Sequence, residues 1–364
     1  MKRIILLGAT GSIGSSACDV VRTHPDDFRI VALSAHRNRA AAEALGREFG
    51  AKAYLGEDGA LRAVEENDAD LVLVSVVGLS GLLPTLAAID KGIDVALATK
   101  EVLVMAGAMV TARARERGVR LLPVDSEHSA IFQCIQENRG TDWNRRISKL
   151  ILTASGGPFL DSPDDLSSVT PAQALNHPRW KMGPKVTVDS STMMNKGFEI
   201  LEARWLFDIP ADRIDVVVHP ESIVHSLVEF EDGATLAQLS PPDMRVPIQY
   251  ALTWPERRPA VRTKLDLPAL SRLTFRAPDP KRFPCLDLVK TACAQGGAAT
   301  AVLSAADEVA VARFLAGEIR YTDIPRILER AIAKAQDLPC ETVEDVLAAA
   351  EIGKHFSQSI AATR

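Results

Sequence analysis

The N-terminal segment constrains the fold most, because a short apolar run leads directly into three regularly spaced glycines. The run Ile4–Leu7 is followed by Gly8-Ala9-Thr10-Gly11-Ser12-Ile13-Gly14, and an amphipathic stretch continues to Thr23. A strand, a tight glycine turn and a helix N-terminus let the backbone approach a pyrophosphate closely. We therefore expect a dinucleotide site here. Because the spacing G-x-x-G-x-x-G alone is a weak signal, a turn without a ligand is the alternative. The expected cofactor contacts are Gly8, Thr10, Gly11, Ser12, Ile13 and Gly14.

The first third of the chain alternates short apolar runs with helical stretches, which is typical of β-α-β units and a parallel sheet. These runs show no alternation of polar and apolar residues, as expected of strands that are buried on both faces. We expect an α/β protein with a Rossmann-like N-terminal domain over residues 1–124. The apolar runs are residues 4–7, 30–33, 71–77, 94–98 and 120–124.

Three further parts are expected after this domain. Residues 125–254 contain more strand-like runs, and two of them flank Asp232-Gly233, which predicts a hairpin in an α+β domain. Residues 255–280 are rich in proline and charge, so a linker is expected. Residues 281–364 are rich in alanine without a strand pattern, which indicates a helical domain. The strand-like runs of the second part are residues 147–153, 185–189, 215–219, 224–230 and 234–239.

Composition argues against several classes of function. The chain has 364 residues, more than one core usually holds, and its net charge of −5 comes without a basic cluster for nucleic acid. No apolar run reaches the roughly 20 residues of a spanning helix, so no membrane partner is expected. The five cysteines include no C-x-x-C pair, which favours reduced thiols in a cytoplasmic protein over disulfides or a zinc site.

The segment after the second apolar run indicates which dinucleotide binds. We expect this strand to end at Leu33, followed by Ser34-Ala35-His36-Arg37-Asn38-Arg39. An NAD site usually places a carboxylate here, whereas arginine suits the 2′-phosphate of NADPH. The segment therefore favours NADPH. The alternative is that Arg37 and Arg39 are solvated charges on a helix.

Two neighbouring carboxylates indicate a divalent metal site. Asp125 and Glu127 follow the last apolar run of the N-terminal domain, and in an extended chain they would point to the same side. Carboxylates this close repel each other unless a cation lies between them or one is protonated. Oxygen ligands favour Mg²⁺ or Mn²⁺ over zinc, and an acidic loop in solvent is the alternative.

A third carboxylate lies on a predicted helix that follows the strand over residues 185–189. Asn195, Glu199 and Glu202 would form one polar stripe, because their spacing returns to the same helix face. Lys196 beside the stripe can neutralise a phosphate or an oxyanion, or it forms a surface salt bridge with Glu199. Ser190 and Ser191 are expected at the start of this helix, as anion contacts or as ordinary caps.

Two more segments have the composition of a ligand site. Ser155-Gly156-Gly157 follows a predicted strand, so its backbone N–H groups and the Ser155 hydroxyl can approach a ligand, although an ordinary turn fits as well. Residues 176–184 combine prolines and glycine with His177 and Trp180, as an active-site lid would. A rigid surface loop anchored by Trp180 is the alternative. His219 and His225 receive no role.

Together these motifs resemble the 1-deoxy-D-xylulose 5-phosphate reductoisomerase family, from residue 1 to at least Tyr321. The resemblance implies a homodimeric oxidoreductase of isoprenoid precursor biosynthesis. Such an enzyme rearranges and reduces 1-deoxy-D-xylulose 5-phosphate to 2-C-methyl-D-erythritol 4-phosphate with NADPH and Mg²⁺ or Mn²⁺. Phosphonate-hydroxamate compounds are expected to inhibit it. The matching segments are Gly8–Gly14, Leu121–Phe132, Ser155–Phe159, His177–Gly183, Met193–Phe207 and His219–Ser226.

The resemblance also assigns roles to single residues. It implies that the metal ligands are Asp125, Glu127 and Glu199, and that Glu127, Lys100 and Lys196 are catalytic. The phosphate contacts are Ser155, His177, Ser190, Asn195 and Lys196. Ser126, Trp180 and Glu199 also contact the substrate. Ala35, His36, Arg37, Asn38, Thr99, Lys100, Glu101 and Gly183 complete the cofactor site.

Two departures from the family pattern are visible. Thr99 stands where the family usually has asparagine, and the stretch between Asn38 and Leu71 is short for the family. Two other classes of function remain open. One is an NADP-dependent dehydrogenase that catalyses no rearrangement, against which the three carboxylates argue. The other is a nucleotide-sensing regulatory protein, which would need neither a metal nor a lid.

Overall fold

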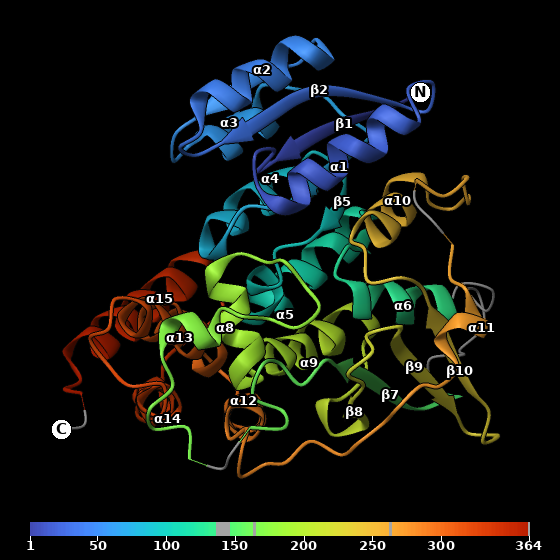
Figure 1. The fold of residues 1–364 in the computed structure, drawn as a ribbon. Helices are drawn as coiled ribbons and strands as arrows, with labels where there is room; N and C mark the ends of the chain where they lie inside the picture. Colours follow the sequence, from blue (N-terminus) through green and yellow to red (C-terminus); the bar gives the residue numbers. More distant parts are fainter. Residues whose placement is uncertain (136–145, 163–164, 262–263, 363–364) are drawn as a thin grey trace. The chain divides into compact units, whose positions relative to one another are not determined.

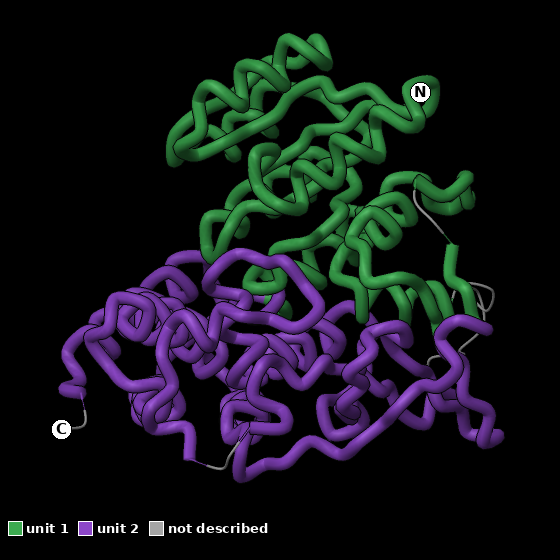
Figure 2. Tube along the Cα trace, viewed as in Figure 1, with its two compact units in different colours: residues 1–102, 107–139, 238–267 green, residues 103–106, 140–237, 268–364 purple. Residues whose placement is uncertain are grey.

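The computed structural model of the chain describes residues 1–135, 146–162, 165–261 and 264–362. The chain forms two compact units, each built from segments that are far apart in sequence (Figure 2). Unit 1 comprises residues 1–102, 107–139 and 238–267, and unit 2 comprises residues 103–106, 140–237 and 268–364. The four-part domain division expected above stays a prediction.

Unit 1 contains a six-stranded parallel sheet with the strand order β3-β2-β1-β4-β5-β6, which confirms the Rossmann-like fold. Figure 1 labels β1, β2 and β5 of this sheet. The strand order reverses between β1 and β4, and α/β proteins bind ligands at the carboxyl ends of the strands at such a point. The loop after β1 lies there. The strands are β1 Lys2–Leu7, β2 Phe28–Ala35, β3 Lys52–Leu55, β4 Leu71–Val74, β5 Asp94–Leu97 and β6 Leu121–Pro123.

Two strands of this sheet differ from the prediction. β2 continues to Ala35 instead of ending at Leu33, because Ser34 and Ala35 still pair with β3. β3 itself was not expected. It has four residues at the edge of the sheet, and only Tyr54 among them is buried, so its sequence lacks a sustained apolar run.

Most helices of unit 1 come from its first two segments, and one helix comes from its distant third segment. α1 has the predicted bounds, and α10 from the distant third segment packs against it. Helix α5 bends at Ala106, and its residues 103–106 belong to unit 2. The helices are α1 Ser12–Thr23, α2 Arg39–Phe49, α3 Gly59–Glu65, α4 Leu82–Asp90, α5 Glu101–Arg117, α6 Ser126–Ile135 and α10 Arg245–Thr253.

Unit 2 combines a mixed four-stranded sheet, of order β10-β9-β7-β8, with the C-terminal helices. β7 Ile147–Ala154 pairs in parallel with β8 Ile214–Val218 and antiparallel with β9 Val224–Phe230. β10 Thr235–Leu239 lies beside β9, so the predicted hairpin is confirmed. The remaining helices are α7 Pro171–Ala174, α8 Pro184–Thr192, α9 Met194–Phe207, α11 Leu267–Leu270, α12 Cys285–Gln295, α13 Ala299–Leu315, α14 Asp323–Ile332 and α15 Val343–Ser359. In the described ranges, none of the helices is long and apolar enough to span a bilayer.

The strand predicted over residues 185–189 is wrong, because these residues form α8. Pro184 stands in the first turn, where a missing N–H costs nothing, and Lys185 Nζ lies 2.6 Å from Asp189 Oδ2 one turn later. Ser190 and Ser191 consequently lie in the last turn of α8 and do not begin a helix. Met193, with a φ of 60°, separates α8 from α9.

Gly14 generates a prediction about the stability of unit 1. A Cβ atom at this position would lie 2.4 Å from the carbonyl oxygen of Gly8, which is backbone and cannot move aside. We expect Gly14→Ala to lower the free energy of unfolding by about 1–3 kcal/mol, measured by chemical denaturation. Gly11→Ala is the matched control, because its Cβ would lie 3.3 Å from the same oxygen. Equal destabilisation by both variants would show that this contact does not restrict residue 14.

Candidate functional site

The glycine loop is held closely against its own sheet. The N–H groups of Gly8 and Ala9 donate to the carbonyl oxygen of Ser34 at 3.1 and 2.9 Å. A Cβ on Gly8, whose φ is 79°, would lie 2.5 Å from the carbonyl oxygen of Ser75. Thr10, Gly11, Ser12 and Ile13 are at least partly accessible at the start of α1. The loop therefore presents a helix N-terminus at the carboxyl end of β1, which fits a bound pyrophosphate.

At the end of β2 and just after it, some residues support the fold and others are exposed to solvent. Ala35 is buried, and Asn38 caps α2 by accepting a hydrogen bond from the N–H of Ala41 at 3.2 Å. Arg39 lies 3.4 Å from Glu43 one turn along α2. His36 and Arg37 are exposed at the end of the strand. Of the two arginines, Arg37 is the better placed for a 2′-phosphate.

The segment Thr99-Lys100-Glu101 begins α5 in unit 1. The Thr99 hydroxyl is buried and donates to the carbonyl oxygen of Val76 at 2.5 Å, so it holds neighbouring strand ends together. Lys100 forms an ion pair with Asp125, and both side chains are largely buried. Glu101 lies in the first turn of α5 and is half-buried. The structure thus brings Lys100 together with the first expected metal ligand.

The segment around Asp125 and Glu127 is not extended, because α6 begins at Ser126, so the side-chain arrangement considered for an extended chain does not apply. Asp125 directly precedes this helix: its carboxylate accepts from the N–H of Ser126 at 2.9 Å, and its carbonyl oxygen accepts from the N–H of Ser129 at 2.8 Å. The Ser126 hydroxyl donates to the Glu127 carboxylate. Both carboxylates remain partly accessible at the start of the helix.

Helix α9 carries the third expected ligand in unit 2. Asn195 Nδ2 donates to Glu199 Oε1 at 2.6 Å, and the Lys196 ammonium pairs with the other carboxylate oxygen. Lys196 is 5% and Glu199 is 1% exposed, so their ion pair is buried and is not the surface salt bridge considered above. Phe198 and Leu201 on the same helix are buried, whereas Trp205 is half-buried.

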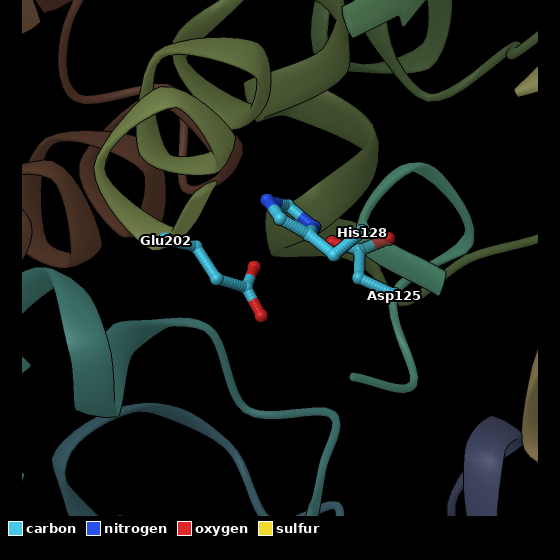
Figure 3. Close-up of side chains that lie close together, drawn as sticks. All are labelled: Asp125, His128 and Glu202. Carbon is cyan, nitrogen blue, oxygen red and sulfur yellow. The ribbon is translucent and has the colours of Figure 1, made fainter. Parts of the chain in front are cut away.

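Two buried ionisable residues received no role from the sequence. Figure 3 shows Asp125 and His128 at the start of α6 in unit 1, and Glu202, which α9 carries in unit 2. His128 and Glu202 are both inaccessible to solvent. The available signal for Glu202 was its position three residues after Glu199, and for His128 its place in the segment that begins with Asp125.

Three of the expected phosphate contacts meet within unit 2. His177 Nε2 lies 3.0 Å from Ser155 Oγ and 3.1 Å from Ser190 Oγ, although the three residues come from three different segments. The glycine pair explains how this is possible. Gly157, with a φ of 66°, lies so close to α8 that a Cβ would be 2.8 Å from the carbonyl oxygen of Ser190.

The loop over residues 177–183, which follows α7, makes contacts at its start, in its middle and at its end. The N–H groups of Arg179 and Trp180 donate to His177 Nδ1 at 3.1 and 2.9 Å. The Trp180 ring meets the His225 ring edge-on at 6.3 Å. Gly183 is the N-cap of α8. Burial lowers the pKa of His177 to about 4, so its ring is neutral at physiological pH.

His219 holds a neighbouring turn together. Its Nε2 accepts from the N–H groups of Ile223 and Val224, each at 3.1 Å, and its ring stacks on Phe275 at 4.8 Å. These contacts show a structural histidine.

Family profiles of one enzyme match successive parts of the chain. The profile described as 1-deoxy-D-xylulose 5-phosphate reductoisomerase matches residues 4–54 and 40–107. Its C-terminal domain profile matches residues 121–207, and the DXP reductoisomerase C-terminal domain profile matches residues 239–356. The enzyme of that name from Geobacter metallireducens is 48% identical over 371 residues, which is 95% of this chain and 96% of the relative. The chain belongs to the 1-deoxy-D-xylulose 5-phosphate reductoisomerase family. It is an enzyme, and its activity is the reductoisomerase reaction.

Solved members of the family share the fold over the whole chain. A DOX-P reductoisomerase in complex with NADPH, fosmidomycin and magnesium has a TM-score of 0.93 and 39% identity, covering 99% of this chain and 98% of its own. The Zymomonas mobilis enzyme in complex with NADPH has a TM-score of 0.88 and 38% identity, with 98% of both chains covered. The α/β fold and the family expected from the sequence are therefore confirmed.

Proposed function

We propose that this chain converts 1-deoxy-D-xylulose 5-phosphate to 2-C-methyl-D-erythritol 4-phosphate, with NADPH as the reductant and Mg²⁺ or Mn²⁺ as the required cation. The observation that carries the proposal is that expected metal ligands are paired with buried lysines inside each unit: Asp125 with Lys100 in unit 1, and Glu199 with Lys196 in unit 2. A 39% identical relative has been solved in complex with NADPH, fosmidomycin and magnesium.

The donor chemistry of these carboxylates fits a hard divalent cation. They offer only oxygen ligands, and a lysine holds one of them in each unit: Lys100 pairs with Asp125, and Lys196 pairs with Glu199. A bound cation would act as a Lewis acid on the substrate carbonyl. The lysines favour the ionised carboxylates that such a cation needs, and Lys196 can also stabilise negative charge that develops on substrate oxygen.

The hydrogen-bonded cluster of Ser155, His177 and Ser190 in unit 2, which we take as the proposed phosphate pocket, supports the choice of a phosphorylated substrate. Ser155, His177 and Ser190 offer hydroxyl and imidazole donors, and Asn195 and Lys196 follow on the next helix. Binding the phosphate there supplies energy remote from the reacting carbons, which can orient them for reaction. The loop over residues 177–183 begins at this pocket, so it can exclude water when the phosphate is bound.

The glycine loop and Arg37 support NADPH as the second substrate. The pyrophosphate would bind at the N-terminus of α1, and the 2′-phosphate would pair with the Arg37 guanidinium. NADPH would supply the hydride, while the protein holds and orients it. We place Lys100, which is fixed by Asp125, near the reacting end of the cofactor.

We also propose a cytoplasmic homodimer, organised into an NADPH domain, a catalytic domain, a linker and a helical domain over the ranges given above. The dimer and the four domains rest on the family resemblance. The cytoplasm is supported by the five cysteines, all of which are free thiols.

We expect Glu199→Gln to lower turnover by at least about a hundredfold, because charge stabilisation by a metal is worth several kcal/mol. NADPH affinity, measured by fluorescence, should stay near wild type, because the dinucleotide loop belongs to unit 1. Glu229→Gln on β9 makes the same chemical change outside the proposed site and should leave both quantities unchanged. Turnover near wild type in Glu199→Gln would remove this residue from the metal site.

A hydroxamate joined to a phosphonate by a short chain should inhibit the enzyme when metal is present. The hydroxamate oxygens would replace the substrate oxygens on the cation, and the phosphonate would occupy the pocket of Ser155, His177 and Ser190. The matched control is the same phosphonate with a methyl ester in place of the hydroxamate, which should bind far more weakly. Full activity at millimolar inhibitor, with Mg²⁺ in excess, would contradict both assignments.

Replacing Arg37 by glutamate should weaken NADPH selectively. A charge-assisted contact with the 2′-phosphate is worth roughly 1.5–3 kcal/mol, or about tenfold to more than a hundredfold in affinity. The ratio of kcat/KM for NADPH over NADH should fall by that factor. Arg39→Glu should change the ratio less, because Arg39 lies 3.4 Å from Glu43. An unchanged ratio in Arg37→Glu would identify Arg37 as a solvated surface charge.

A further inference from the structure

We infer that His177 is a positioning residue for the loop over residues 177–183, in addition to its expected contact with phosphate. One ring nitrogen fixes the turn that begins the loop, and this leaves the other as a hydrogen-bond donor toward Ser155 and Ser190. The inference rests on the proposed function only in taking this pocket as the phosphate site.

The backbone determines the protonation of the ring. The N–H groups of Arg179 and Trp180 both point at Nδ1, from 3.1 and 2.9 Å. An amide N–H can only donate, so Nδ1 must accept and carries no proton. The arrangement is the histidine equivalent of an Asx turn, in which an asparagine or aspartate oxygen accepts from the backbone a few residues later.

The opposite nitrogen then has a fixed role. A neutral imidazole carries one proton, so with Nδ1 as the acceptor the proton is on Nε2. Nε2 therefore donates toward the hydroxyl oxygens of Ser155 and Ser190, at 3.0 and 3.1 Å. The lowered pKa of His177, caused by its burial, agrees with a neutral ring.

The direction of these hydrogen bonds sets what the pocket can bind. Ser155 Oγ also accepts from the N–H of Gly157 at 3.2 Å, so its lone pairs are used within the protein. Its own O–H is then available to donate to a ligand. A pocket that presents donors selects a ligand that only accepts, such as a phosphate oxygen. A turn in the loop thus prepares the pocket for an anion.

The same turn places Trp180. Beyond the turn, Arg179 Nε donates to the carbonyl oxygen of Pro220 at 3.1 Å, and the Trp180 ring lies against His225 at 6.3 Å. Removing the acceptor at Nδ1 releases the start of the loop, while Ser155 and Ser190 keep their places on other segments. The two functions of His177 therefore belong to different atoms and can be separated by substitution.

Asparagine and glutamine separate them. In His177→Asn the amide oxygen is near the former position of Nδ1, so it can accept from the Arg179 and Trp180 N–H groups, but the side chain is too short to reach the serines. In His177→Gln the longer side chain reaches the serines, and its amide is displaced from the Nδ1 position. The asparagine variant should keep the turn, and the glutamine variant should keep the contact with the two serines that orients them for phosphate.

Amide hydrogen exchange in the ligand-free enzyme reads out the turn. We expect exchange at Arg179 and Trp180 to accelerate by about tenfold or more in His177→Gln and to stay near wild type in His177→Asn. The Thr187 amide, which donates to Gly183 at 3.0 Å inside α8, is the internal control and should not change in either variant. Titration calorimetry with inorganic phosphate should show the reverse order, with the weaker binding in His177→Asn.

Steady-state kinetics gives the functional half of the test. His177→Asn should mainly raise KM for the phosphorylated substrate, and His177→Gln should mainly lower kcat, because the loop no longer closes in the right place. Equal exchange rates at Arg179 and Trp180 in the two variants would overturn the inference. Wild-type phosphate affinity in both variants would instead count against the proposed phosphate site, so the two failures are distinguishable.

A measurement on the unmodified protein tests the inference even if a variant does not fold. Long-range ¹⁵N–¹H correlation spectra distinguish the two neutral tautomers of histidine. We expect His177 to carry its proton on Nε2 near neutral pH. A proton on Nδ1 would overturn the inference without any substitution.

Discussion

A carboxylate that is removed from water must be matched by positive charge or by hydrogen-bond donors, and the site residues of both units depend on this requirement. In unit 2, Glu199 is held by Asn195 and Lys196 from the same helix. In unit 1, Lys100 at the start of α5 holds Asp125. Each expected metal ligand of this kind is thus fixed before any cation binds, which lowers the entropic cost of binding one.

Buried carboxylates that need positive charge also connect two helices of unit 2. Lys185 Nζ lies 2.6 Å from Asp189 and 2.8 Å from Asp307, so one lysine links α8 to α13 through two buried carboxylates. α8 carries Ser190 in its last turn, and the loop that begins at His177 ends at its N-cap. A C-terminal helix that is far away in sequence therefore helps to hold the helix that carries Ser190.

The sequence predicted elements wherever local chemistry decides the structure. Helix α1 and the hairpin of β9 and β10 were predicted because a glycine loop and an Asp-Gly turn leave few alternatives. The strand predicted over residues 185–189 was wrong, because Pro184 in the first turn and the pair of Lys185 with Asp189 one turn apart favour a helix. The addition of α10 to unit 1 depends on its packing against α1, a long-range contact without a local signal.

The candidate site was predictable in its residue types but not in its internal contacts. Carboxylates, serines and histidine in short motifs indicated a cation and a phosphate. That Lys196 is buried, or that His177 accepts from its own loop, depends on which segments meet, and spacing along the chain does not contain this information. The burial of His128 and Glu202 likewise depends on which segments meet, so the sequence did not predict it.

The most direct test of the proposed chemistry is one product analysis. The purified enzyme would be incubated with 1-deoxy-D-xylulose 5-phosphate and NADPH, first with a chelator and then with excess Mg²⁺, and the product identified by NMR. We expect one NADPH to be consumed for each 2-C-methyl-D-erythritol 4-phosphate formed, and only after Mg²⁺ is added. NADPH consumption that is unaffected by the chelator, or a reduced product with the original carbon skeleton, would contradict a metal-dependent rearrangement.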